Sequence, residues 1–185
     1  MKKTYSIEIA GLKRELPLCP INDKTSIAAF IMFSDVEITV AAAGELLKKL
    51  PDFDVVVTAE SKGIPLAYEI ARQSGKKYVV ARKSVKLYMT NPVSVKVKSI
   101  TTANVQTLYF SEDDAELVKG KRVLIADDVI STGESLKAIE ELVNTAGGNI
   151  AAKAAVLAEG DAAKRKDIVF LEKLPIFTEQ KNTLQ

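Results

Sequence analysis

Residues 123–135 read Val123-Leu124-Ile125-Ala126-Asp127-Asp128-Val129-Ile130-Ser131-Thr132-Gly133-Glu134-Ser135, and they indicate the architecture of the whole chain. The run opens with apolar residues, as is typical of a strand that is buried on both faces, and two acids follow at its carboxyl end. Small hydroxyl residues and a glycine then lead into a predicted helix at 135–146, which ends at Gly147-Gly148. A strand, a loop and a helix in this order predict one unit of a parallel α/β sheet.

The same order recurs on both sides of this unit. Residues 54–59 form a compact β-branched run, and Gly63 then opens a predicted helix at 65–74 that stops at Gly75. Residues 77–81 and 150–157 are near-continuous apolar runs and supply two further strands. We therefore expect an α/β fold with a central parallel, doubly wound sheet.

Two regions extend this core. Residues 5–18 alternate polar and apolar side chains around an Ala10-Gly11 turn, and Ser34-Asp35 can cap a helix with Val40, Ala43, Leu46 and Leu47 on one face. Residues 82–111 hold two β-like stretches, 93–100 and 105–110, which predict a flexible β-hairpin. We expect a single domain over 1–185, with amino-terminal strands and a helix in 1–50 and the hairpin in 82–111.

Composition excludes several classes of function. The 185 residues contain no histidine, which removes the Ser-His-Asp triad, the HExxH zinc site and histidine acid/base catalysis. The single cysteine, Cys19, allows no intrachain disulfide and fits a reducing cytoplasm. A net charge of +2 argues against a nucleic-acid partner held by bulk charge.

No targeting or membrane segment is visible in the sequence. Residues 1–8 alternate polar and apolar residues where a signal peptide would open an apolar core, so we expect a mature start. No apolar run approaches the roughly 18 residues of a membrane span. These observations predict a cytoplasmic protein with no membrane partner.

The loop after the two acids has the chemistry of a phosphate site. Backbone N–H groups and the helix dipole favour an anion at a helix start, and Ser131, Thr132 and Ser135 add hydroxyl donors. Asp127 and Asp128 suit a diol, such as ribose hydroxyls, or a positive charge that develops on a sugar ring. The alternative is ordinary local structure, because Ser131-x-x-Glu134 has the pattern of a capping box and paired acids are common in turns.

A second anion loop and a basic hairpin accompany the first. Residues 59–65 combine a lysine, a glycine and a proline at a strand end, which indicates another anion site or, alternatively, a plain turn with a solvated lysine. Residues 81–111 contain no acid and five basic residues: Arg82, Lys83, Lys86, Lys96 and Lys98. Such an arm suits a polyphosphate, although we interpret Lys96 and Lys98 as an outer, solvated face. GxxxxGK[ST] and GxGxxG motifs are missing, so phosphosugar chemistry remains.

These motifs resemble the type I phosphoribosyltransferases, most closely the adenine branch of the purine enzymes. Residues 124–135 resemble the site for the 5-phosphate end of phosphoribosyl pyrophosphate, and residues 60–63 resemble the pyrophosphate loop. Ala81-Arg82-Lys83 is similar to the basic pair at a strand end, and residues 82–111 are similar to a flexible hood. The resemblance covers residues 54–161. It implies transfer of a phosphoribosyl group to a purine base, with adenine first, to give AMP and pyrophosphate in purine salvage.

The resemblance also implies residue roles, a metal and an assembly. Asp127 and Asp128 would be catalytic and hold the ribose hydroxyls, and Glu159 would lie on the base side, since residues 157–161 are similar to hypoxanthine-type enzymes. The 5-phosphate would be held by Val129, Ile130, Ser131, Thr132, Gly133, Glu134 and Ser135. Pyrophosphate would be held by Glu60, Ser61, Lys62, Gly63, Arg82, Lys83 and Lys86. Mg²⁺ would arrive on pyrophosphate, so no protein ligand to a metal is assigned, and the family implies a homodimer.

Three departures keep other functions open. The hood lacks the glutamate of adenine-specific members, Ser131 replaces an acid of the 6-oxopurine enzymes, and Glu134 stands where the family usually has glycine. The alternatives are therefore a hypoxanthine/guanine or xanthine enzyme, an orotate-type enzyme, or a non-catalytic regulatory protein that binds a phosphoribosyl ligand. A DNA-binding repressor is disfavoured, because residues 1–50 hold seven basic residues against six acids and are predicted to form strands.

Overall fold

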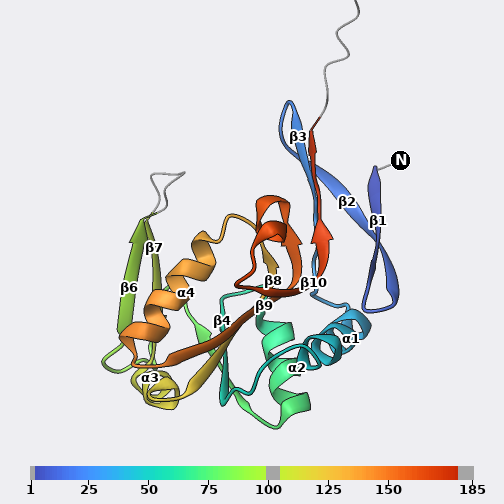
Figure 1. The fold of residues 1–185 in the computed structure, drawn as a ribbon. Helices are drawn as coiled ribbons and strands as arrows, with labels where there is room; N and C mark the ends of the chain where they lie inside the picture. The colour runs from blue at the N-terminus through green and yellow to red at the C-terminus, as the bar shows by residue number, and fades with distance from the viewer. Residues whose placement is uncertain (1–2, 99–104, 179–185) are drawn as a thin grey trace, which may run out of the picture.

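A computed structural model describes residues 3–98 and 105–178, so the tip of the predicted hairpin and both chain ends lie outside the described residues. Its centre is a five-stranded parallel sheet in the order β10-β9-β8-β4-β5 (Figure 1). The strands are β4 (Val55–Ala59), β5 (Lys77–Ala81), β8 (Arg122–Ile130), β9 (Asn149–Glu159) and β10 (Val169–Leu174). The predicted parallel α/β sheet is confirmed.

Helices cover both faces of this sheet. Helices α1 (Val36–Leu47) and α2 (Ile64–Ser74) pack on one face, and α4 (Glu134–Thr145) packs on the other (Figure 1). Each face has its own buried apolar cluster, because alternate residues of a strand point to opposite sides: Val56 and Leu124 meet α1 and α2, whereas Val57 and Ile125 meet α4. The sheet is therefore doubly wound, as the sequence predicts.

Helix ends lie close to the predicted signals. Asp35 caps α1 by accepting a hydrogen bond from the Ile38 N–H at 3.1 Å. Helix α2 ends at Gly75, whose φ of +69° is a left-handed conformation that favours glycine. One expectation for α1 is wrong, since Val40 is 41% exposed and the buried face is formed by Ile38, Thr39, Ala42, Ala43 and Leu46.

A second, antiparallel sheet joins the two ends of the described chain. Its order is β1-β2-β3-β11, with β1 (Thr4–Ile9), β2 (Leu12–Asn22), β3 (Thr25–Ala28) and β11 (Ile176–Thr178). The hairpin of β1 and β2 around Ala10-Gly11 is confirmed. Strands β3, β10 and β11 were not predicted from the sequence, and the pairing of Ile27 with Ile176 depends on contact between distant segments.

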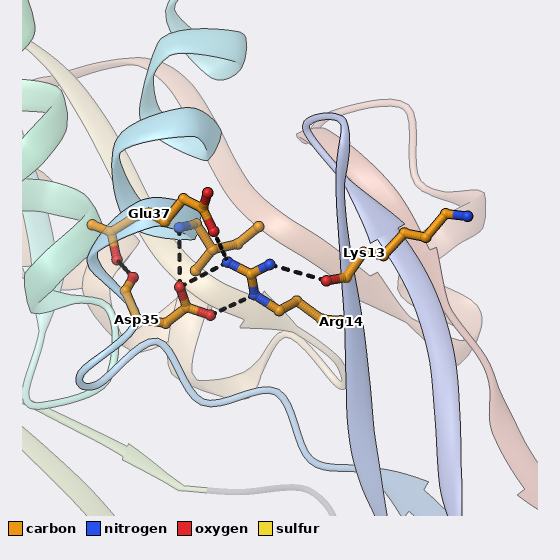
Figure 2. A network of polar contacts seen from close by, with 6 residues as sticks. Lys13, Arg14, Asp35 and Glu37 are labelled. Carbon is orange, nitrogen blue, oxygen red and sulfur yellow. Dashed lines mark hydrogen bonds and ion pairs between the residues drawn. The ribbon is translucent and has the colours of Figure 1, made fainter.

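A partly exposed network of ion pairs joins this sheet to α1 (Figure 2). The Arg14 guanidinium of β2 forms two hydrogen bonds to Asp35, 2.7 Å from Nε to Oδ2 and 3.0 Å from Nη2 to Oδ1, and one of 2.8 Å to Glu37. The hydrogen bonds from Arg14 are the main reason that the pKa of Asp35 is lowered. One aspartate thus caps the helix and holds the strand.

The predicted hairpin is formed by β6 (Val93–Lys98) and β7 (Val105–Phe110), and residues 99–104 between them lie outside the described residues. Arg82 and Tyr109 exchange two backbone hydrogen bonds of 2.9 Å, which tie the hairpin to the end of β5. A short helix that the sequence analysis did not predict, α3 (Glu112–Val118), follows with a capping box between Ser111 and Asp114.

The region around the two acids differs from expectation in two ways. Strand β8 does not stop before the acids but continues through them to Ile130, because Asp127, Val129 and Ile130 still pair with β9. The alternative of a capping box at Ser131 is also wrong, since the N-cap of α4 is Gly133 and it makes no side-chain cap hydrogen bond. Among residues 3–98 and 105–178, no helix is long and apolar enough to cross a membrane.

Candidate functional site

The carboxyl ends of β4, β5 and β8 meet at one edge of the parallel sheet, which is the edge where ligands bind in open α/β folds. A pocket of about 210 Å³ opens there. Its lining includes both predicted acids and four of the predicted pyrophosphate residues: Ala59, Glu60, Ser61, Lys62, Lys83, Gln106, Asp127, Asp128, Val129 and Ser135. The structure thus brings together segments that are more than 20 residues apart in the sequence.

The two acids differ in their surroundings. Asp128 is 3% exposed, and Lys62 Nζ lies 3.4 Å from its Oδ2. Asp127 is half-buried, and its Oδ1 accepts a hydrogen bond of 2.9 Å from the Asp128 N–H. Burial raises the pKa of Asp127 to about 7, and the neighbouring Asp128 carboxyl adds to the increase. The pair therefore holds a proton close to neutral pH.

Unsatisfied polar atoms gather at this edge. Within the described residues, three buried side-chain atoms have no hydrogen-bond partner: Thr58 Oγ1, Arg82 Nε and Asp128 Oδ2. They belong to the carboxyl end of β4, the residue after β5 and the carboxyl part of β8. A buried polar group without a partner costs about 1–3 kcal/mol. Of the three residues, Asp128 lines the pocket, so its Oδ2 is the atom that a polar ligand in the pocket could satisfy.

Gly63 is required here by close packing. A Cβ at this position would lie 2.4 Å from Thr58 Oγ1 and 2.8 Å from Asp127 Oδ1, although its backbone φ of −74° suits any residue. Pro65 then occupies the first turn of α2, as predicted. The glycine thus lets the loop after β4 approach the acids of β8. The peptide bond between Glu60 and Ser61 in this loop is cis.

The side chain of Glu60 does not present a free carboxylate to the pocket. Its Oε2 accepts a 2.9 Å hydrogen bond from the Lys83 N–H, and its Oε1 lies 3.2 Å from Arg82 Nη2 and 3.9 Å from Lys86 Nζ. The Lys83 N–H is the main reason that the pKa of Glu60 is lowered, and the charges of Arg82 and Lys86 act in the same direction. Glu60 therefore fastens the loop after β4 to the base of the hairpin.

This arrangement divides the predicted pyrophosphate residues. Glu60, Ser61, Lys62 and Lys83 line the pocket with the acids, whereas Gly63, Arg82 and Lys86 do not. Arg82 and Lys86 both lie within 4 Å of Glu60 Oε1. Their side chains therefore face this carboxylate, which partly neutralises their charges. Lys62 and Lys83 are the cations of this set that line the pocket.

The predicted phosphate loop encloses a pocket of its own, of about 110 Å³. Six of the seven predicted residues line it with Asp127 and Leu136: Val129, Ile130, Ser131, Thr132, Gly133 and Ser135. Gly133 has a φ of +81°, so the loop turns through a conformation that favours glycine before α4 begins. Glu134, the first residue of α4, is not among the lining residues.

The hairpin contributes a residue that the sequence did not suggest. Gln106 of β7 lines the pocket of the acids, and together with Val105, Thr107, Lys83 and Ser135 it also lines a neighbouring hollow. The amide of Gln106 can donate and accept hydrogen bonds. Gln106 lies in the same hairpin that lacks the glutamate of adenine-specific family members.

Glu159 lies at the end of β9, on the other side of the phosphate loop. It lines a pocket of about 390 Å³ with Ser131, Thr132, Asp161, Ala162, Arg165 and Ile176. The structure therefore places Glu159 beside the phosphate loop, and its base-side role stays a prediction. Arg165 and Ile176 were not singled out from the sequence.

The donor set bears on the expected Mg²⁺. No group of three or more His, Cys, Asp or Glu side chains gathers within the described part of the chain. Asp128 Oδ2 is nevertheless buried without a hydrogen-bond partner, and carboxylate oxygens are ligands that Mg²⁺ accepts. These residues fit an ion whose remaining ligands come from a phosphate-bearing molecule and from water.

Comparison with known proteins tests the family resemblance that the sequence motifs indicate. The model of the phosphoribosyl transferase domain family matches residues 34–181. The chain belongs to this family. The type I resemblance that the sequence motifs indicate is thereby confirmed.

Individual relatives agree with this assignment. The chain is 36% identical over 123 residues to an adenine phosphoribosyltransferase of Cenarchaeum symbiosum, which covers 63% of this chain and 66% of that protein. It is 32% identical over 108 residues to an orotate phosphoribosyltransferase of Caldanaerobacter subterraneus subsp. tengcongensis, which covers 57% and 46%. These matches span less than two thirds of the relatives' own length.

A solved structure shares the fold over almost the whole chain. The crystal structure of adenine phosphoribosyltransferase from Thermoanaerobacter pseudethanolicus superposes with a TM-score of 0.65 at 22% identity. The superposition covers 92% of this chain and 95% of that one. The shared fold therefore extends beyond residues 54–161, which carry the sequence motifs.

Proposed function

We propose that this phosphoribosyltransferase moves the 5-phosphoribosyl group from phosphoribosyl pyrophosphate to adenine, which gives AMP and releases pyrophosphate in purine salvage. The observation that carries the proposal is the buried Asp128 Oδ2, which has no hydrogen-bond partner and lies between two anion loops. A ribose diol would supply the missing partner, and the two loops would take the phosphates at either end of the same molecule.

Each part of the site has a proposed task. The residues of the 131–135 loop hold the 5-phosphate by N–H and hydroxyl donors, and Ser61, Lys62 and Lys83 hold pyrophosphate. Asp127 and Asp128 accept hydrogen bonds from the ribose hydroxyls and stabilise positive charge that develops on the ring as pyrophosphate leaves. Positioning and charge stabilisation supply most of the rate.

Glu60, Gly63, Arg82 and Lys86 act less directly in this proposal. Glu60 joins the pyrophosphate loop to the base of the hood, which we define as residues 82–111. Gly63 permits the close approach of that loop to Asp127. The charge of Glu134 lies outside the phosphate pocket, so it does not oppose the phosphate from within the lining.

Magnesium enters as a companion of the substrate. Asp127 and Asp128 are the residues that would hold it, either directly or through the ribose hydroxyls. When bound, the ion neutralises charge on pyrophosphate and makes it a better leaving group. The chain's own contribution is to place the two carboxylates beside the ring.

The choice of adenine rests on the named activity of relatives and on one pocket. Glu159 lines the pocket beside the phosphate loop, where a carboxylate accepts hydrogen bonds from an exocyclic amino group but repels a 6-oxo group. We propose this pocket as the base side. Adenine carries the amino group at position 6, whereas hypoxanthine and xanthine carry oxygen there.

Pyrophosphate release tests this proposal directly. The intact chain is mixed with phosphoribosyl pyrophosphate and Mg²⁺, and adenine, hypoxanthine, guanine, xanthine and orotate are offered separately. We expect turnover with adenine and at least tenfold lower kcat/KM with the others. Glu159→Gln, which keeps the size of the side chain, is expected to narrow that preference. Turnover restricted to a different base would overturn the assignment of adenine.

Orotate phosphoribosyl transfer is the second candidate function. It is favoured by a specific observation, because an orotate phosphoribosyltransferase is 32% identical to this chain over 108 residues. Orotate is an anion, so the carboxylate of Glu159 would oppose it, and Glu159→Gln should then raise activity with orotate. If adenine is the substrate, Glu159→Gln should lower kcat/KM for adenine, whereas if orotate is the substrate the same substitution should raise kcat/KM for orotate.

A non-catalytic protein that binds a phosphoribosyl ligand is the remaining outcome. It would bind phosphoribosyl pyrophosphate measurably and release pyrophosphate with none of the five bases. The same measurement thus separates an enzyme from a regulatory protein.

We also propose that the chain is one cytoplasmic domain that forms a homodimer. The segment after β5 exposes Val85, Leu87 and Tyr88, and Leu87 is fully exposed in the isolated chain. Apolar side chains that gather in one segment are typical of a covered surface. Light scattering should give twice the chain mass of 20.1 kDa, and Leu87→Asp should lower it.

A further inference from the structure

A network of four charged residues lies behind the phosphate loop, outside the pocket that the loop encloses. Arg165, which follows the 3-10 turn η1 (Gly160–Lys164), donates two hydrogen bonds to Asp167: 2.9 Å from Nε to Oδ1 and 2.7 Å from Nη2 to Oδ2. Lys153 of β9 donates to the same carboxylate at 2.6 Å and lies 3.1 Å from Glu140 of α4. The network is neutral as a whole.

The geometry fixes the guanidinium in one orientation. A two-point bond between an arginine and a carboxylate holds the planar fork more firmly than a single contact would. Lys153 restrains Asp167 in turn, and its side chain is only 17% exposed. The hydrogen bonds from Arg165 are the main reason that the pKa of Asp167 is lowered, so this carboxylate stays ionised through the neutral range.

The third nitrogen of the fork lies against the loop. Arg165 Nη1 is 2.6 Å from the place where a Cβ on Gly133 would stand. The two hydrogen bonds to Asp167 use Nε and Nη2, so Nη1 is the guanidinium nitrogen that lies outside this two-point bond. Gly133 therefore provides both the left-handed turn and the space for the guanidinium. Arg165 also lines one pocket with Ser131 and Thr132 of the loop.

We propose that Arg165 is a positioning residue for the phosphate loop, and that its positive charge behind Gly133 strengthens binding of a sugar phosphomonoester. The part that concerns the phosphomonoester rests on the function proposed above. The alternative, a purely structural ion pair, accounts for Asp167 and Lys153 but does not account for the close approach of Nη1 to Gly133. Charge at this place acts on the 5-phosphate and has little effect on pyrophosphate, which the other loop holds.

Calorimetry with two partial ligands tests the proposal without turnover. Ribose 5-phosphate probes the phosphate loop, and inorganic pyrophosphate probes the loop after β4. Arg165→Gln removes the charge but keeps hydrogen-bonding capacity, and we expect about tenfold weaker binding of ribose 5-phosphate with less than twofold change for pyrophosphate. Raising the salt concentration should reduce the difference between the wild type and this variant.

Two further variants keep the test specific. Lys166→Gln changes the net charge by the same amount at an exposed neighbouring residue and should leave both affinities unchanged. Asp167→Asn keeps the charge of Arg165 but removes the carboxylate that orients the guanidinium, and it makes the network one charge more positive. Because a positioning residue acts through its orientation, we expect about threefold weaker binding of ribose 5-phosphate, and tighter binding would contradict the positioning role. Amide hydrogen exchange of residues 131–135 should be faster in Arg165→Gln than in Lys166→Gln.

Different results would contradict the role of Arg165 and the proposed enzyme activity. Equal weakening of both ligands, or unchanged affinity for ribose 5-phosphate with a raised KM for the base, would overturn the positioning role. A wild-type chain that binds ribose 5-phosphate but turns over no base would overturn the proposed enzyme and leave the role of Arg165 standing. A wild-type chain that binds neither ligand would overturn both.

Discussion

The two edges of the parallel sheet carry aspartates beside basic residues, but their polar groups are in opposite states. At the amino end, Asp54 accepts hydrogen bonds from the Arg122 N–H at 2.9 Å, from Nε at 3.1 Å and from Nη2 at 2.8 Å. At the carboxyl end, Asp128 Oδ2 accepts none and Asp127 shares its environment with a second carboxyl. The pKa of Asp54 is lowered, chiefly by Arg122, whereas burial raises that of Asp127 to about 7.

The difference separates structural pairs from ligand sites. A carboxylate whose lone pairs are already filled stabilises the fold and has little left for a ligand. Asp128 has an ion pair with Lys62 at 3.4 Å, but its buried Oδ2 accepts no hydrogen bond. Such an oxygen costs stability in the empty protein, and this stability is regained when a ligand donates a hydrogen bond to it. The types of residue are alike at the two edges, and only the completeness of their hydrogen bonding tells them apart.

The largest expected effect is a loss of kcat/KM when the two acids at the carboxyl edge of the sheet are replaced. Replacing both Asp127 and Asp128 by asparagine removes the charge beside the ribose ring, and we expect kcat/KM to fall by at least about 10³-fold, since one electrostatic donor alone is worth about 10²–10³. The temperature of thermal unfolding at pH 8 should not fall, because the exposed Lys62 is the one cation paired with this buried charge within the described residues, at 3.4 Å, and the substitutions remove the desolvation cost of the two carboxylates.

The matched control is Asp54→Asn at the other edge. It should lower thermal stability slightly and leave kcat/KM within twofold. If Asp54→Asn impaired turnover in a fully folded protein, or if the double variant stayed active, the contrast between the two edges would be wrong.

A smaller effect is expected from crowding the gap between the pyrophosphate loop and β8. Gly63→Ala places a methyl group 2.4 Å from Thr58 Oγ1 and 2.8 Å from Asp127 Oδ1. The loop or the acid must shift, and a displacement of about 1 Å costs about 10²-fold in rate. Steady-state kinetics would measure this loss.

Gly75→Ala is the comparison variant for this effect. Nothing lies within 4 Å of its added Cβ, but its φ is +69°, so it should cost about 1 kcal/mol of stability and leave kcat/KM unchanged. Comparable losses of rate in both variants would show that the close approach at Gly63 has no special role.

The pH dependence of ligand binding tests the contrast between the lowered pKa of Asp54 and the raised pKa of Asp127. Ribose hydroxyls donate to an ionised carboxylate, so binding of phosphoribosyl pyrophosphate should release the proton that Asp127 holds below pH 7. Linkage then predicts tighter binding as pH rises from 6 to 7, by up to about tenfold for one proton released, and a plateau above. Stability of the ligand-free chain should change in the opposite direction, because the folded state holds a proton that the unfolded state has lost.

Titration calorimetry in two buffers of different ionisation enthalpy would count this proton. Asp127→Asn should abolish the release and flatten the affinity between pH 6 and 7. Binding that is independent of pH in the wild type would place the proton elsewhere.

The smallest expected effect concerns the exposed lysines. Lys83 lines the pocket of the acids, whereas Lys96 lies exposed on β6. Lys83→Ala should weaken phosphoribosyl pyrophosphate by about threefold to tenfold at low salt, and the difference should fade as salt is raised. Lys96→Ala serves as the control and should change affinity by less than twofold. Equal effects would mean that the hood acts by its overall charge.

The elements of the parallel sheet could be predicted because each carries its own local signal. Buried apolar runs give β4, β5, β8 and β9, and Gly75 stops α2 by its left-handed conformation. The extension of β8 through Asp127 and Asp128 could not be seen, since acids are rare in strands and their pairing with β9 depends on tertiary contact. Strands β3 and β11 depend on pairing between distant segments.

Two turns show how local signals can mislead and be overlooked. The patterns Ser131-x-x-Glu134 and Ser111-x-x-Asp114 both fit a capping box, but only the second forms one in the structure. Gly133 takes the cap of α4 instead, with a left-handed φ of +81°. A Cβ at this position would lie 2.6 Å from Arg165 Nη1. The missed helix α3 could have been found from its serine and its three acids in the first turn.

The residues of the site that form contiguous motifs could be predicted from the sequence, whereas the residues that contact these motifs from other segments could not. The acids and the phosphate loop have contiguous motifs, and they line the expected pockets. The turn of Glu60 toward Lys83 and Arg82, and the positions of Thr58, Gln106 and Arg165, follow from how separate segments meet. No spacing within one segment encodes such contacts.

The pairing of β3 with β11 has a consequence for the synthesis of the chain. Ile27 leaves the ribosome early, but its partner Ile176 is made near the end of the described residues. The parallel strands can assemble in the interval, while the first hairpin lacks its last neighbour. We therefore expect the antiparallel sheet to close last, so that a nascent chain halted before Ile176 would expose the edge of β3 to other unfinished chains.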